Sequence, residues 1–161
     1  MKKLLLAVIA ITFLFTSCET ENETFETSTS DLVFKFENDF TNSIIGEGNG
    51  DSFQLLVSDA SIMKAAKTFV EKQELDLVPE SYKIEIIDGK EYLRIYSNDS
   101  FVSTIALIID SERGFRTTGS TVCTSSSCAS GGGCVPRGEY CTKCTELAKE
   151  CHRTTTGEIP R

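Results

Sequence analysis

The sequence predicts an α+β fold: one helix packed on a three- to four-strand antiparallel meander, followed by a small disulfide-rich C-terminal segment. Three observations lead to this prediction. Residues 60–74 carry apolar side chains at helical spacing, and residues 82–122 are strand formers divided by turn sequences. Six of the seven cysteines lie after residue 122.

The N-terminus has the pattern of an export signal. Lys2 and Lys3 supply a short positive region, and Leu4 to Phe15 is an apolar run interrupted only by Thr12. This run is too short to span a bilayer as a helix but has the length of a signal-peptide core. We therefore expect residues 1–17 to be a signal peptide.

The residues around Cys18 extend this prediction. The sequence Phe15-Thr16-Ser17-Cys18 resembles the lipobox of bacterial lipoproteins, although Phe15 stands where the usual pattern has Leu, Val or Ile. The acidic run behind it resembles that of Bacteroidota-type surface lipoproteins (Glu19, Glu21, Glu23, Glu26). The resemblance implies a lipid on Cys18 and a place in the cell envelope, at the surface or periplasmic face of the outer membrane. Secretion without lipid and a cytosolic apolar helix are the alternatives.

The charge of the exported chain excludes one class of partner. Loss of Lys2 and Lys3 with the signal leaves 14 basic against 24 acidic side chains, a formal charge of −10. An acidic chain without a basic stripe repels nucleic acid, so we expect no such partner. Residues 18–31 are polar and acidic with few apolar side chains, which predicts a flexible tether.

Residues 32–122 are predicted to form the α+β domain. Leu32 to Phe36 alternates in part and predicts a first strand, and the glycine-rich residues 46–52 predict a loop. Ser58 and Asp59 offer an N-cap for a helix over 60–74. One stripe of that helix is apolar (Ile62, Ala65, Ala66, Phe69, Val70).

The meander follows this helix. Tyr82–Ile87 and Tyr92–Tyr96 flank Asp88-Gly89, the sequence of a two-residue type I′ hairpin. Phe101–Ile109 and Phe115–Val122 complete a set of four β-rich segments. A helix with one apolar face would cover one side of such a sheet.

The composition changes at residue 123. Residues 123–161 contain few large apolar residues, so cross-links would have to replace a core. We expect structural disulfides among the six cysteines of this segment (Cys123, Cys128, Cys134, Cys141, Cys144, Cys151). Fifteen pairings exist, and the sequence does not choose among them. A helix over 142–151 would hold Cys144 and Cys151 too far apart to bond.

Two more specific functions remain possible for this tail, redox activity and zinc binding. Cys141 and Cys144 form a C-x-x-C motif, the pattern of a redox-active dithiol. The same pair with Cys151 or His152, which is the single histidine, also has the ligand types of a zinc site. Structural disulfides are the preferred interpretation, because the motif does not follow an early strand of a βαβ unit.

The sequence gives little support for other catalytic sites or for a calcium site. His152 has no nucleophile motif beside it, and no pair of acids is singled out for glycoside hydrolysis. Glu47, Asn49 and Asp51 alternate like calcium ligands, but the glutamate that closes an EF-hand is missing. The sequence thus predicts no cofactor, no metal and no catalytic residue.

We therefore expect a lipid-anchored binding or interaction protein rather than an enzyme. Its predicted partners are the membrane, through the lipid on Cys18, and a protein or glycan at the cell surface. The alternative is an exported thiol–disulfide oxidoreductase that uses Cys141 and Cys144.

Overall fold

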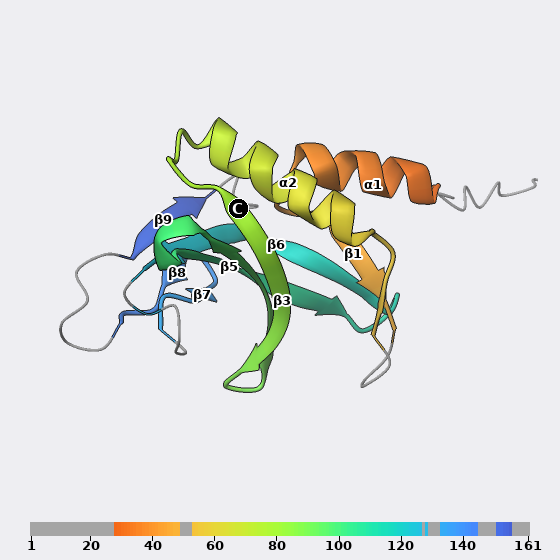
Figure 1. The fold of residues 1–161 in the computed structure, drawn as a ribbon. Helices are drawn as coiled ribbons and strands as arrows, with labels where there is room; N and C mark the ends of the chain where they lie inside the picture. Colours follow the sequence, from red (N-terminus) through yellow and green to blue (C-terminus); the bar gives the residue numbers. More distant parts are fainter. Residues whose placement is uncertain (1–27, 49–52, 127, 129–132, 145–150, 156–161) are drawn as a thin grey trace, which may run out of the picture.

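The computed structural model describes residues 28–48, 53–126, 128, 133–144 and 151–155 (Figure 1). Within these ranges, two helices lie on one face of a curled antiparallel sheet. The predicted signal peptide, Cys18 and most of the predicted tether lie outside the described residues. Neither described α-helix is long and apolar enough to cross a membrane.

The elements follow one another along the chain. The helices are α1 (Thr29–Asn38), α2 (Asp59–Lys72) and the short 3-10 helix η1 (Asn98–Ser100). The strands are β1 (Ile44–Glu47), β2 (Gln54–Leu55), β3 (Pro79–Ile87), β4 (Lys90–Ser97), β5 (Val102–Asp110), β6 (Phe115–Ser125), β7 (Pro136–Arg137), β8 (Tyr140–Cys141) and β9 (His152–Thr155).

The first predicted strand is wrong, because residues 32–36 belong to α1. The Ser28 side chain caps this helix by accepting a hydrogen bond from the Asp31 backbone N–H. Phe36 is fully buried while Phe34 is 70% exposed, so these two residues point to different sides. The helix also takes up the last residues of the predicted tether, which ended at Asp31.

The predicted main helix is confirmed with shifted ends. α2 has Ser58 as its N-cap, and all five residues of the predicted apolar stripe are buried. It ends before residue 74, because Glu74 adopts a positive φ of 53°. The backbone N–H of Leu75 then donates to the Val70 carbonyl at 2.9 Å, which closes the helix end.

The sheet is larger than predicted. The four-strand meander β3–β6 is present, but the strand order in the described residues is β2-β1-β6-β5-β4-β3, with β9 also paired to β6. Gly46 and Glu47, expected in a loop, form part of β1 and pair with both β2 and β6. A one-residue register break between Ile44 and Gly46 explains why the alternating pattern of a strand is hard to recognise there.

The predicted type I′ hairpin is confirmed. Asp88 and Gly89 both have positive φ, 50° and 72°, and the flanking residues Ile87 and Lys90 pair directly. This turn twists in the same sense as the strands it joins, and glycine at its second position adopts the required φ without strain.

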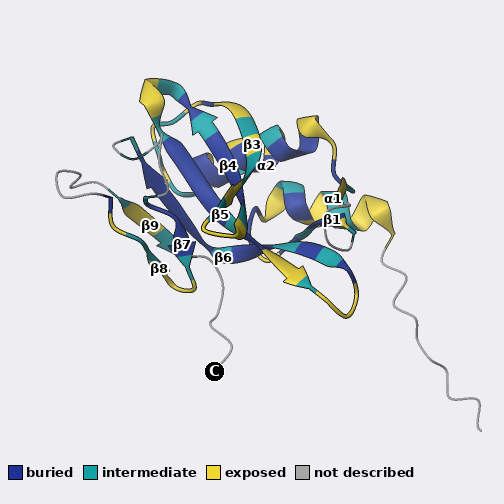
Figure 2. Cartoon of the chain, turned by 90° about the horizontal axis from the view of Figure 1, so that it is seen from below, coloured by how far each residue is buried: buried dark blue, intermediate teal, exposed yellow. Residues whose placement is uncertain are grey.

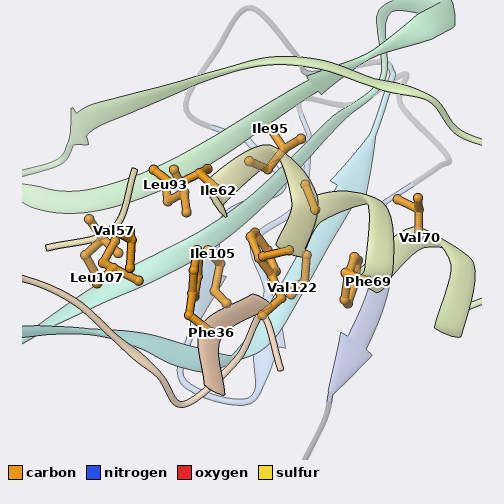
Figure 3. Packing of buried hydrophobic residues seen from close by; sticks show 14 residues of the cluster. Phe36, Val57, Ile62, Phe69, Val70, Leu93, Ile95, Ile105, Leu107 and Val122 are labelled. Atoms are coloured by element: carbon orange, nitrogen blue, oxygen red, sulfur yellow. The ribbon is translucent and has the colours of Figure 1, made fainter. Parts of the chain in front are cut away.

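The main core lies between the helices and one face of the sheet. Alternate residues of β4 and β5 point to this core, as do Ile62 and Phe69 from α2 (Figure 3). Phe40, which follows the end of α1, links the two helices: its ring centroid lies 6.0 Å from that of Phe36 in α1 and 5.4 Å from that of Phe69 in α2. Burial of this apolar surface is the main force that holds the helices to the sheet.

The cysteine-rich tail adds a strand to the sheet and covers part of the face that points away from the helices. β6 runs through the predicted boundary at residue 122 to Ser125, and β9 from the tail pairs with β6. The small hairpin of β7 and β8 lies on the side of the sheet away from the helices (Figures 1 and 2). This outer face of the sheet is therefore covered in part by the tail.

Candidate functional site

The six cysteines of the described tail form three disulfides. These are Cys123–Cys141, Cys128–Cys144 and Cys134–Cys151, with Cα–Cα distances of 5.8, 5.7 and 5.6 Å. In chain order, the first cysteine pairs with the fourth, the second with the fifth and the third with the sixth. Each bond closes a loop that overlaps the other two, so the segment is held as one unit, as the disulfide-stapled prediction requires.

This pairing divides the C-x-x-C motif. Cys141 bonds to Cys123 in β6, and Cys144 bonds to Cys128. A C-x-x-C redox enzyme alternates between a dithiol and a disulfide within the motif, and here the two sulfurs belong to different bonds. The pairing therefore disfavours the oxidoreductase alternative. Cys144 and Cys151 are not joined to each other, and residues 145–150 of the helix considered between them lie outside the described residues.

The structure also shows where the residues of the two metal-binding alternatives lie. No group of three or more His, Cys, Asp or Glu side chains with metal-site geometry occurs within the described ranges. The sulfurs proposed as zinc ligands are in disulfides, and His152 is an exposed residue of β9. Glu47 is exposed in β1, while Asn49 and Asp51 lie outside the described residues.

The outer face of the sheet carries a row of large side chains from β4. Tyr92, Arg94 and Tyr96 alternate along the strand; Tyr92 is fully buried and Arg94 is 4% exposed. The Tyr92 hydroxyl is 3.5 Å from the Pro136 carbonyl of β7, to which it donates. Burial raises the pKa of Tyr92, which keeps this donor protonated.

An ionic network neutralises the buried cation of this row. Arg94 Nη1 lies 2.7 Å from a carboxylate oxygen of Glu85, and the Tyr96 hydroxyl donates to the other oxygen at 2.8 Å. The hydrogen bond from Arg94 holds the pKa of Glu85 below its usual range. The guanidinium carbon of Arg94 also lies 5.7 Å from the centre of the Tyr96 ring. Because both oxygens of the carboxylate are occupied, this network serves structure.

A groove of about 470 Å³ opens between the outer face and the tail hairpin. The β3–β4 hairpin, β5 and β6 form its floor and one side, while the β7–β8 hairpin forms the other wall. Its lining includes Tyr92, Ala106, Ile108, Gly119, Thr121 and Pro136. A volume of this size lies within the range of small-molecule sites in proteins.

Two contacts hold the hairpin wall against the sheet. Cys141 of β8 is bonded to Cys123 of β6, and Arg137 of β7 forms a 2.7 Å ion pair with Asp88 of the β3–β4 turn. The disulfide fixes the hairpin at Cys141, and the ion pair holds it at Arg137, next to its turn. The groove is therefore preformed in the oxidised chain.

A bulge in β6 shapes the floor of the groove. Ile105 pairs with Val122 and Leu107 with Thr118, so one residue of β5 faces three residues of β6. Gly119 lies in this bulge, and a Cβ added there would be 3.8 Å from both the Ala106 Cβ and the Ile108 Cδ1. The missing side chain keeps this part of the floor open.

Sequence reasoning did not find this groove. Nine of its sixteen lining residues are aliphatic, glycine or proline and the others are polar, charged or aromatic; they come from four separate segments, and only the fold brings them together. One local signal was present: the residues Pro136 to Cys141 carry a Gly-Glu turn that predicts a short hairpin.

The described residues thus form an α+β domain whose cysteine-rich tail is held by three disulfides and borders a groove. No protein-family model, curated protein or solved structure matches this chain.

Proposed function

We propose that the chain is an exported, lipid-anchored binding protein that holds its ligand in the groove beneath the disulfide-linked hairpin. The observation that carries this proposal is the groove wall formed by β7 and β8. Disulfides form and persist in oxidising compartments outside the cytosol, which agrees with the predicted export signal. The lipid on Cys18 would keep the domain at the membrane.

The geometry suits binding because its walls are rigid. A preformed site spends little of its binding free energy on ordering loops. The two strands of the hairpin also bond to each other, with Arg137 facing Tyr140 and Pro136 facing Cys141. Catalysis would need reactive groups in the groove, and three candidates in its lining, Glu91, Tyr92 and Arg137, are engaged in ion pairs or a hydrogen bond.

The groove assignment is tested by filling it. Gly119 has no positive φ, and the atoms nearest to an added Cβ lie at ordinary contact distances, so Gly119→Leu should fold and occupy the groove. We expect small-molecule fragments to shift the methyl NMR signals of Ala106 and Ile108 in the wild-type chain. In Gly119→Leu the affinity of these fragments should fall at least about tenfold, a loss of about 1.4 kcal/mol.

Lys67→Leu is the matched control, since it adds the same side chain to the exposed side of α2, across the sheet from the groove. Its fragment affinities should equal those of the wild type. Fragments that bind Gly119→Leu as well as the wild type, or that leave Ala106 and Ile108 unshifted, would contradict the proposed site.

The anchor is tested separately at Cys18. In a diderm bacterium, Cys18→Ser should move the protein from the membrane fraction to the soluble envelope fraction, because no sulfur remains to carry lipid. Ser17→Gly keeps a small residue before the cysteine and should stay with the membrane. Immunoblots of the two fractions measure the distribution, and a Cys18→Ser protein that stays membrane-bound would refute the anchor.

A further inference from the structure

We infer that the groove takes a small, neutral, mostly aliphatic molecule, and that the hydroxyl of Thr121 is its hydrogen-bonding partner inside the groove. The inference rests on the proposed binding function and adds the class of ligand. It follows from the apolar lining, from one buried hydroxyl that has no partner among the described residues, and from the ion pairs that already engage Glu91 and Arg137 of the lining.

The apolar character comes from both walls. Ala106 and Ile108 of β5 have the same side-chain orientation along the strand, and Ile108 is 55% exposed. Pro136 lines the hairpin side, and Tyr92 uses its hydroxyl on the Pro136 carbonyl. A ligand that covers the exposed surface of Ile108 gains free energy by removing it from water, while the buried Tyr92 and Pro136 provide an apolar wall for van der Waals contact.

Thr121 provides the polar feature. Its side chain is 1% exposed, and Oγ1 has no hydrogen-bond partner in the described part of the chain. The next residue, Val122, packs in the helix-side core, so strand alternation directs Thr121 to the outer face. Buried polar groups without partners are uncommon in folded proteins, and a ligand hydroxyl or carbonyl in the groove would supply the missing bond.

The charges near the groove do not favour a charged ligand. The Arg137 guanidinium is paired with Asp88 at 2.7 Å, and Glu91 is paired with the buried Arg116 at 2.9 Å. Lys90 and Glu139 complete the charged lining with one charge of each sign. Because these two side chains have opposite signs, an ionic ligand meets one attractive and one repulsive group, and the small net attraction does not offset the hydration that the ligand loses.

Three ligands of one chain length test the class. 1-Octanol, octanoate and octylammonium are titrated at pH 7 into the oxidised full chain in detergent-free buffer, and the methyl signals of Ala106 and Ile108 are followed. We expect 1-octanol to shift both signals and to bind at least about tenfold more tightly than either ion.

Two variants test the role of Thr121. Thr121→Val keeps the shape of the side chain and should weaken 1-octanol binding about three- to tenfold, since one neutral hydrogen bond is lost. It should also raise the unfolding midpoint of the free chain, because an unsatisfied hydroxyl is removed. Ser97→Ala removes another buried hydroxyl, one outside the groove that has no partner within the described ranges, and should stabilise the chain without changing 1-octanol affinity.

The outcomes distinguish this inference about the ligand from the proposed binding function on which it rests. Octanoate or octylammonium binding as tightly as 1-octanol would overturn the neutral class, and equal 1-octanol affinity in Thr121→Val and wild type would overturn the role of Thr121. If fragments bind at Ala106 and Ile108 but 1-octanol does not, the inference fails while the binding groove stands. If neither binds there, the proposed function fails as well.

Discussion

Arg94 shows how single residues decide the outer face of the sheet. It lies between Tyr92 and Tyr96 on β4 and is buried, whereas an arginine in an alternating strand is normally expected in solvent. Glu85 makes this burial tolerable by approaching from β3 to 2.7 Å. A buried guanidinium needs a close carboxylate to compensate for its lost hydration, so the pair acts as a unit.

The pair predicts a dependence of stability on pH. Because Arg94 lowers the pKa of Glu85 in the folded chain, the contribution of the pair is present above the ordinary value of 4.5 and is lost as the pH falls through the lower folded value. Glu85→Gln should lower the free energy of unfolding at pH 7 by about 2 kcal/mol. Urea unfolding at pH 7 and pH 3 measures this change.

At pH 3 the difference between wild type and Glu85→Gln should become smaller, since below pH 4.5 the unfolded wild-type chain binds a proton at Glu85 and is stabilised relative to the folded chain. Glu112→Gln, a change at an exposed residue of the β5–β6 turn, should leave the unfolding curve unchanged at both pH values. A difference between Glu85→Gln and wild type that does not change with pH would contradict the ionic account.

At the scale of elements, α1 and α2 show when periodicity is a safe guide. The stripe of α2 repeats over nine residues, from Ile62 to Val70, and every member is buried as predicted. The segment Leu32–Phe36 is too short for its period to be decided, since its apolar residues fit both a strand and a helix. Packing of Phe36 and Phe40 against α2 selects the helix.

The close contact between α2 and the sheet predicts a sensitivity to side-chain size. Ala65 is fully buried, and a leucine there would force neighbouring side chains out of their preferred rotamers. Ala65→Leu should lower the free energy of unfolding by about 1–3 kcal/mol in denaturant titrations. Ala60→Leu places the same residue at an exposed position of the same helix and should change it by less than about 0.5 kcal/mol. Equal effects of both variants would contradict the packing account.

At the scale of the whole molecule, the sheet separates a helix layer from a disulfide-linked layer. Apolar burial holds the helix side. On the other side the cysteines form a second cluster around Cys123, Cys134 and Cys144, with little aliphatic surface. The two layers are thus stabilised by different forces, and they should respond differently when the disulfides are removed.

This difference is tested with the bond that ties β8 to β6. Replacing Cys123 and Cys141 together by alanine opens a loop of 18 residues and should lower the free energy of unfolding by about 3 kcal/mol. Amide hydrogen exchange should then rise in β7 and β8 but stay slow in α2, since the helix-side core is intact. Equal loss of protection in α2 would show that the layers do not act separately.

The sequence by itself determined the α2 stripe, the Asp88-Gly89 turn, the acidic charge and the gathering of six cysteines in the tail. Each of these depends on residues that are close in the chain, where spacing alone carries the information. The tertiary structure decided the helical state of α1, the joining of β1 and β9 to the sheet, the pairing of the cysteines, the burial of Arg94 and the groove around Gly119 and Thr121. These features depend on contacts between segments far apart in the chain, and such contacts exist only after the sheet has brought the segments together.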